Sequence, residues 1–107
     1  MAEPRPMRLR AQRHGDRVVV RVLMSHPMEN GRRRDEAGRL VPAWHIREVM
    51  VQLDGHTVMT AQWGPSVSVD PFLQFHLRGA QAPAGSRLAV TWTDSRGEQR
   101  SDETLIG

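Results

Sequence analysis

Apolar and polar residues alternate with a period of two through most of this sequence. The alternation is clearest at Leu73, Phe75 and Leu77, which polar residues separate, and it recurs over residues 87–93. A period of two places successive side chains on opposite faces of a β-strand. No stretch has the apolar periodicity of a helix long enough to connect parallel strands. We therefore predict an all-β protein with about seven short strands, over residues 7–12, 17–24, 44–53, 56–63, 72–78, 87–93 and 98–106.

Turn residues between these segments favour an antiparallel arrangement. Asp54-Gly55 is the strongest hairpin signal in the chain and predicts that the segments on either side of it pair. Ile46 falls on the wrong side of the alternation, so we expect a β-bulge near Arg47. Residues 66–69, bracketed by Gly64-Pro65 and Asp70-Pro71, are predicted to form a short extended piece.

This pattern predicts an immunoglobulin-like antiparallel β-sandwich, with a small barrel as the alternative. The Cys pair and the tyrosine corner of antibody domains are missing, because the sequence has neither Cys nor Tyr. A length of 107 residues fits one domain. We expect residues 1–6, with Pro4 and Pro6, to be a disordered N-terminal arm, and residues 7–107 to be a single sandwich domain.

The connection over residues 24–42 departs furthest from regular alternation. It leaves an apolar run, passes Pro27, becomes dense in charge and turns at a glycine. A connection of this length is usually functional or mobile. Its run Arg32, Arg33 and Arg34, followed by two acidic residues, predicts either a solvated loop tip or a patch that steers anions.

Met24, His26 and Met28 are spaced by two at the start of this connection. If the strand continued, all three side chains would share one face and offer the soft thioether and imidazole ligands that Cu(I) accepts. The alternative is a contact surface lined by methionine, which adapts well to partners. None of the five histidines has the spacing of a zinc site.

All fifteen basic residues are arginine, yet the net charge is only +3. The arginines are spread along the sequence, which favours a solvated surface over a nucleic-acid footprint. No segment approaches the ~20 apolar residues of a membrane helix. The first twelve residues contain no apolar run of signal-peptide length.

The residues present do not form a recognisable catalytic motif. There is no cysteine to act as a nucleophile or to hold sulfur, and no nucleophile elbow or phosphate loop is visible. We therefore predict a binding protein rather than an enzyme. Trp92 falls on the inward-facing side of the alternation, so we expect it in the core. Trp44 and Trp63 are expected either to lie at the edge of the core or to anchor a protein interface.

Several of these segments together resemble a known family. The block over residues 24–31, the pair Val41-Pro42 with its neighbours, and Gln62-Trp63-Gly64-Pro65 resemble the Z subunit of the SoxYZ sulfur carrier of bacterial thiosulfate oxidation. Asp70-Pro71-Phe72 and Trp92-Thr93-Asp94 extend the resemblance, although an Asn is expected at position 70. The resemblance runs in order from about Met7 to Leu105.

The resemblance implies an immunoglobulin-like sandwich that forms a tight heterodimer with a Y subunit, whose flexible C-terminal arm carries a cysteine. Other Sox enzymes act transiently on the sulfur held there. It implies no catalytic residue, no cofactor and a periplasmic location reached together with the exported partner. The residues expected to support the partner surface are Met24, His26, Met28, Trp44 and Trp63.

Two other functions remain open at this point. One is a periplasmic metal or electron-transfer accessory domain that uses Met24, His26 and Met28. The other is a basic nucleic-acid-binding module. An uncovered edge strand would also allow the isolated chain to self-associate.

Overall fold

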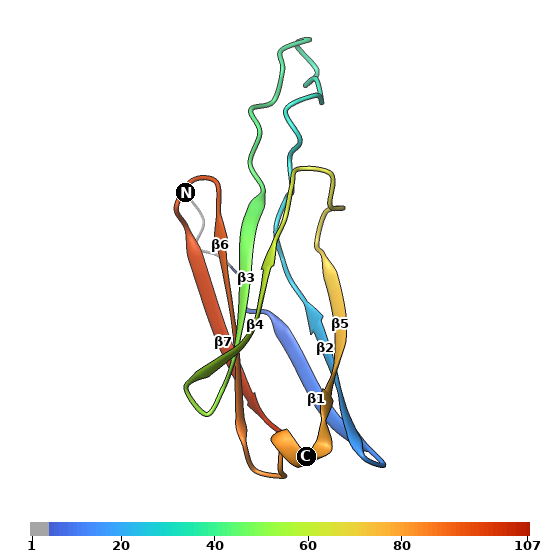
Figure 1. Ribbon diagram of the computed structural model, residues 1–107. Helices are drawn as coiled ribbons and strands as arrows, with labels where there is room; N and C mark the ends of the chain where they lie inside the picture. Colours follow the sequence, from blue (N-terminus) through green and yellow to red (C-terminus); the bar gives the residue numbers. More distant parts are fainter. Residues whose placement is uncertain (1–4) are drawn as a thin grey trace.

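The computed structural model describes residues 5–107, so residues 1–4 of the predicted N-terminal arm lie outside it. Figure 1 shows the described chain as two antiparallel sheets packed face to face, which confirms the predicted all-β sandwich. Its strands are β1 (Arg8–His14), β2 (Arg17–Leu23), β3 (Ile46–Leu53), β4 (His56–Gln62), β5 (Phe72–Arg78), β6 (Arg87–Asp94) and β7 (Gln99–Leu105).

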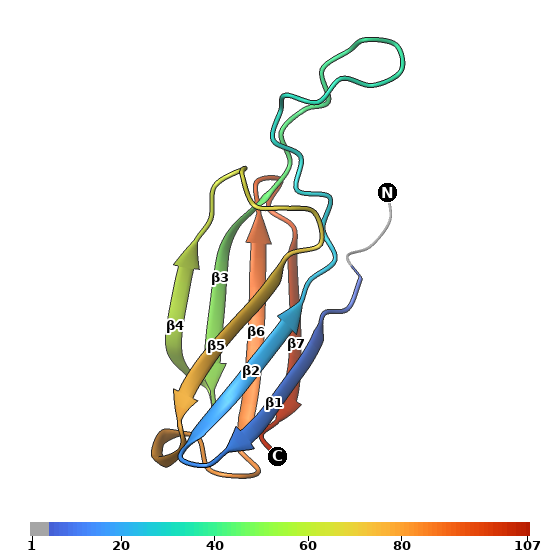
Figure 2. The same cartoon turned by 90° about the vertical axis from the view of Figure 1, so that its right-hand side faces the viewer.

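The sheets differ in size and cross each other at an angle. One has the strand order β1-β2-β5 and the other β4-β3-β6-β7. Figure 2 looks through the smaller sheet onto the larger one. Among residues 5–107, no helix is long and apolar enough to cross a membrane. The only helical element described is a 3-10 turn, η1 (Gly79–Gln81).

The core lies between the sheets and is built from alternate residues of each strand. Burial of each Val, Leu or Ile side chain contributes roughly 1.5–3 kcal/mol. Trp92 is the largest fully buried side chain, as its parity predicted. The buried apolar cluster comprises Met7, Ala11, Val18, Val20, Val22, Met24, Met28, Ile46, Val49, Val51, Leu53, Ala82, Leu88, Val90, Trp92 and Ile106.

Two local predictions on β3 are confirmed. Its register against β6 shifts between Ile46 and Glu48, which is the bulge expected near Arg47. The extra residue turns Ile46 inward, where it is fully buried. Asp54 and Gly55 join β3 to β4 with positive φ angles of 49° and 85°, as a two-residue hairpin requires.

The extended piece predicted over residues 66–69 is wrong, because Ser66 lies in a turn and Val67 and Val69 in bends. They lie between two prolines, which cannot donate ladder hydrogen bonds. No strand lies in register with them, and the backbone of Asp70 then takes a positive φ of 49°. Flanking turn signals alone do not make the residues between them a strand.

The two sides of the sandwich are closed differently. Beside β1 and β7, the backbone N–H of Met7 donates to the Asp102 carboxylate at 2.9 Å, and the N–H of Gly107 donates to the Ala11 carbonyl at 3.3 Å. On the other side, β4 and β5 are the edge strands of their sheets. Self-association of the isolated chain through such an edge stays a prediction.

Gly79, at the start of η1, is the tightest glycine position described. Its N–H donates to the Asp16 carbonyl at 2.7 Å, and a Cβ there would lie 2.7 Å from the same oxygen. We expect Gly79→Ala to lower the free energy of unfolding by about 1–3 kcal/mol, because backbone must move to admit the methyl group. Urea unfolding measures this change.

Gly64→Ala is the matched control, because a Cβ at Gly64 meets nothing within 4 Å. Its expected effect is within about 0.5 kcal/mol. Equal stability of the two variants would contradict the packing described around Gly79.

Candidate functional site at the base of the long loop

The connection between β2 and β3, residues 24–45, is the most prominent feature outside the sandwich. Figures 1 and 2 show it extending well beyond one end of the two sheets, away from the C-terminus. The described chain measures 53 × 22 × 19 Å as a result. We call this segment the β2–β3 loop.

The two legs of the loop are held together by short antiparallel bridges. At the base, Glu29 and Trp44 exchange backbone hydrogen bonds of 2.7 and 2.8 Å. Further out, the N–H of Val41 donates to the Arg33 carbonyl at 2.8 Å, and the Asp35 carboxylate closes the tip by accepting two backbone N–H groups. The loop is therefore an ordered ribbon with defined legs and a defined tip.

The alternation of β2 continues into the loop after the sheet ladder has ended. Met24, His26 and Met28 all point inward, with only 1%, 3% and 6% of their surfaces exposed. They do share one face, as their spacing predicted, but that face belongs to the core. A partner therefore has no direct access to these side chains, and any role in binding must act through the shape of the loop base.

His26 makes hydrogen bonds through both ring nitrogens. Nδ1 accepts from the Met28 backbone N–H at 3.0 Å, so the ring proton resides on Nε2, which lies 3.0 Å from Asp94 Oδ2. The sulfur of Met28 accepts the Ile46 N–H at 3.3 Å. The lone pairs that a copper ion would need are therefore used within the protein.

Asp94, at the end of β6, is the centre of the cluster. Oδ2 accepts the Trp44 indole N–H at 2.7 Å as well as the bond from His26. Oδ1 accepts the backbone N–H groups of Arg96 and Glu98, each at 2.9 Å. One carboxylate thus joins the loop base to the β6–β7 turn.

These hydrogen bonds determine the charge state of Asp94. Burial by itself raises the pKa of a carboxyl group, but the bonds from His26, Trp44 and the two backbone N–H groups outweigh it. The pKa of Asp94 therefore lies below its ordinary value. The group is a buried carboxylate that is fully satisfied by donors.

Aromatic rings enclose the His26 imidazole. Trp44 and Trp92 meet it edge to face, with centroid distances of 5.3 and 5.2 Å. Arg96 places its guanidinium 3.9 Å above the Trp44 ring. Trp44 is half-buried, so it forms the solvent-facing wall of the cluster.

The structure separates the other predicted site residues from this cluster. Trp63 follows β4, donates its N–H to the Arg47 carbonyl at 2.8 Å and packs half-buried against the core. Arg33 forms an ion pair with Glu29 at 2.9 Å, and Arg34 donates to the Gly38 carbonyl at 2.7 Å. Arg32 is exposed beside them. Anion steering by these three arginines stays a prediction.

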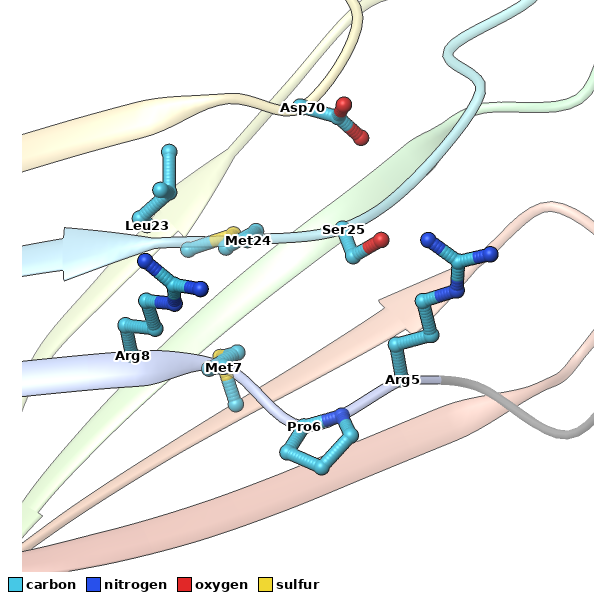
Figure 3. A pocket seen from close by; sticks show the side chains of 8 residues that line it. All are labelled: Arg5, Pro6, Met7, Arg8, Leu23, Met24, Ser25 and Asp70. Atoms are coloured by element: carbon cyan, nitrogen blue, oxygen red, sulfur yellow. The ribbon is translucent and has the colours of Figure 1, made fainter.

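A shallow pocket of about 510 Å³ opens between the start of β1 and the end of β2. Figure 3 shows Arg5 reaching toward Ser25 and Arg8 reaching toward Leu23, with the Asp70 carboxylate beyond Ser25. One oxygen of that carboxylate accepts the His26 backbone N–H at 3.0 Å. The pocket thus adjoins the loop base and combines both signs of charge.

The arrangement of His26 and Asp94 is structural rather than catalytic. A general base needs a free imidazole nitrogen aimed at a nucleophile, and here Nδ1 is occupied by the Met28 N–H. Within residues 5–107, no three His, Asp or Glu side chains come close enough to hold a metal ion. Sequence reasoning missed Asp94 because Asp94-Ser95-Arg96-Gly97 reads as an ordinary turn.

Asp94→Asn tests the cluster. The side-chain amide would present a donor to the Trp44 and His26 N–H groups, so we expect a loss of about 2–4 kcal/mol in the free energy of unfolding near neutral pH. Glu36→Gln, at the exposed loop tip, should change it by less than about 0.5 kcal/mol. Urea unfolding measures both.

The effect of Asp94→Asn should depend on pH. The folded pKa of Asp94 is depressed, so its contribution is complete above the unfolded value of about 3.9 and is lost as the pH falls through the folded pKa. The difference between wild type and variant should therefore shrink below about pH 4. A difference that stays constant down to about pH 2 would contradict this assignment.

Comparisons with known proteins agree with the fold and identify the family. Residues 7–105 match the family described as sulphur oxidation protein SoxZ. No curated protein matches the chain. The crystal structure of a hypothetical protein from Pyrococcus horikoshii OT3 is similar, with a TM-score of 0.66 and 16% identity over 98% of this chain and 90% of that one.

A superoxide reductase crystallised in the oxidised state is also similar in fold. Its TM-score is 0.65 at 16% identity, over 99% of this chain and 90% of that one. At such identities the two structures support the sandwich alone. The family match extends over nearly the whole chain and gives it a role in sulfur oxidation by the Sox system. This chain therefore belongs to the SoxZ family of sulphur oxidation proteins.

Proposed function

We propose that this chain is the non-catalytic subunit of a SoxYZ-type sulfur carrier. In this role it binds and scaffolds a Y subunit whose C-terminal cysteine arm carries the sulfur during thiosulfate oxidation. The observation that carries the proposal is the family match over residues 7–105. The location proposed is the periplasm, which the chain reaches together with its exported partner.

The composition of the sequence supports a role in which this chain binds the partner and the partner carries the sulfur. A covalently held sulfur intermediate requires a thiolate, and these 107 residues contain no cysteine. The buried His26–Asp94 pair has no free lone pair directed at a substrate. A subunit of this composition contributes by binding the chain that carries the reactive thiol.

The loop base supports a particular way of binding. Met24, His26 and Met28 are buried, so in this proposal they hold the β2–β3 loop in the direction in which it meets the partner. Trp44 and Trp63 are half-buried and supply apolar surface at the contact. Leu40, near the tip of the loop, is exposed to solvent and adds a further apolar side chain to the proposed contact.

Co-expression with the Y subunit tests the proposal. We expect a stable complex with one copy of each chain on size-exclusion chromatography with light scattering. The chain purified alone should leave thiosulfate unchanged. Failure to associate with any cysteine-bearing Y subunit would refute the proposal, as would turnover of a sulfur compound by the isolated chain.

Trp44→Phe tests the role of the loop base in binding. An aromatic ring is kept, although it is smaller than indole, and the hydrogen bond to Asp94 is lost, so the loop base should loosen while the sandwich stays folded. We expect the heterodimer dissociation constant to rise about tenfold, which corresponds to ~1.4 kcal/mol. Val58→Ser, which changes an exposed residue of β4, is the control. Isothermal titration calorimetry measures both, and an unchanged constant for Trp44→Phe would contradict this role.

A further inference from the structure

The outer face of the smaller sheet gathers arginines that are distant in the sequence. Apart from Arg13, which donates to the buried Ala82 carbonyl, the polar positions of β1, β2 and β5 point away from the core, and strand pairing arranges them in rows. One row aligns His14, Arg17 and Arg78, and another aligns Arg10, Arg21 and Gln74. We call the exposed polar residues on this side of the sheet the basic face: Arg8, Arg10, Gln12, His14, Arg17, Arg21, Gln74, His76 and Arg78.

The basic face has almost no compensating negative charge. Its three strands contain no Asp or Glu, and the acidic residues that flank them most closely in the sequence are Asp16 in the β1–β2 turn and Asp70 before β5. Within residues 5–107, none of the five arginines of the face makes an ion pair. The outer face of the larger sheet is different, because Arg87 forms an ion pair there with Glu103 at 4.0 Å.

This arrangement is unfavourable for the isolated chain. Arg10 lies directly opposite Arg21, and Arg17 lies directly opposite Arg78. Like charges in directly opposed cross-strand positions destabilise a sheet. Arg21 donates to the Gln74 side chain at 3.2 Å, but that group is neutral and does not balance its charge. A sheet that keeps such pairs without any carboxylate is suited to a partner that supplies negative charge.

An exposed apolar pair borders the basic face at one end. Leu23 and Phe72 are paired across β2 and β5 and are 41% and 59% exposed, and Arg8 pairs with Leu23 on the other side. Arginine beside exposed apolar and aromatic side chains is the composition of protein interfaces. Binding of single-stranded nucleic acid relies on several aromatic side chains for stacking, whereas this face has only Phe72.

We propose that the basic face docks an acidic surface of a protein that visits the sulfur carrier. The arginines attract the partner over long range and speed its encounter, and Leu23 with Phe72 provides the apolar contact once it has docked. The identity of this partner protein, but not the existence of the face, rests on the proposed function. The face and its charge are independent of that function.

The test compares two triple variants with the same change in net charge. The face variant is Arg10→Gln, Arg17→Gln and Arg21→Gln, and the control is Arg32→Gln, Arg33→Gln and Arg34→Gln in the loop. The probe is a fluorescein-labelled polyglutamate peptide of about 20 residues, and a DNA duplex with the same number of charges is the competing class. Anisotropy gives the dissociation constants over a range of salt concentrations.

We expect the face variant to weaken polyglutamate binding about tenfold at low salt and to flatten its salt dependence. Its melting temperature should stay the same or rise by a few degrees, because two like-charge pairs are removed. The loop variant should retain most of the binding. Complex formation with the Y subunit, measured on the same samples, reports separately on the proposed function.

Four results would overturn the inference. If both variants lost the same affinity for polyglutamate, net charge alone would decide the binding. If the loop variant lost more affinity, the binding site would lie at the loop tip. Tight binding of the duplex together with undetectable binding of polyglutamate would make the face a nucleic-acid surface. A face variant that binds like wild type and melts at the wild-type temperature would show that these arginines are an ordinary solvated surface.

Discussion

The carboxylate of Asp94 accepts hydrogen bonds from the β2–β3 loop and from the β6–β7 turn at the same time. Because it is buried, each of these donors would be costly to leave unpaired. The loop base can therefore adopt few other conformations while Asp94 stays ionised. The direction in which the long loop leaves the sandwich depends on this one charged group and on the His26 and Trp44 side chains that meet it.

This construction explains how a domain without a thiol can serve sulfur chemistry. Met24, His26 and Met28, whose spacing suggested a metal site, are buried and hold the base of the loop. A partner can therefore recognise only the shape and the charge of the exposed surface. A rigid sandwich presents an ordered ribbon at one end and a positively charged sheet face along one side. Such surfaces suit recognition of other proteins, which is the task that the function proposed for this chain requires.

Local sequence rules predicted much of the fold because they describe interactions between near neighbours. The wrong parity of Ile46 indicated the bulge, and Asp54-Gly55 indicated the hairpin, since backbone geometry alone requires them. The same rules failed at residues 66–69, where the flanking Gly-Pro and Asp-Pro pairs indicated an extended piece but no described strand lay alongside. They also missed the role of Asp94, because its partners Trp44 and His26 are 50 and 68 residues away.

What the sequence determined by itself was the class of fold, the absence of a thiol and the shared face of Met24, His26 and Met28. Periodicity and composition are properties of the chain before it folds, so they can be read directly. Only the tertiary structure decided that this shared face is buried and that arginines scattered from position 8 to position 78 line one side of one sheet. The order of charges in a sequence does not give their arrangement in space. The electrostatic potential at the surface depends on which strands lie next to each other.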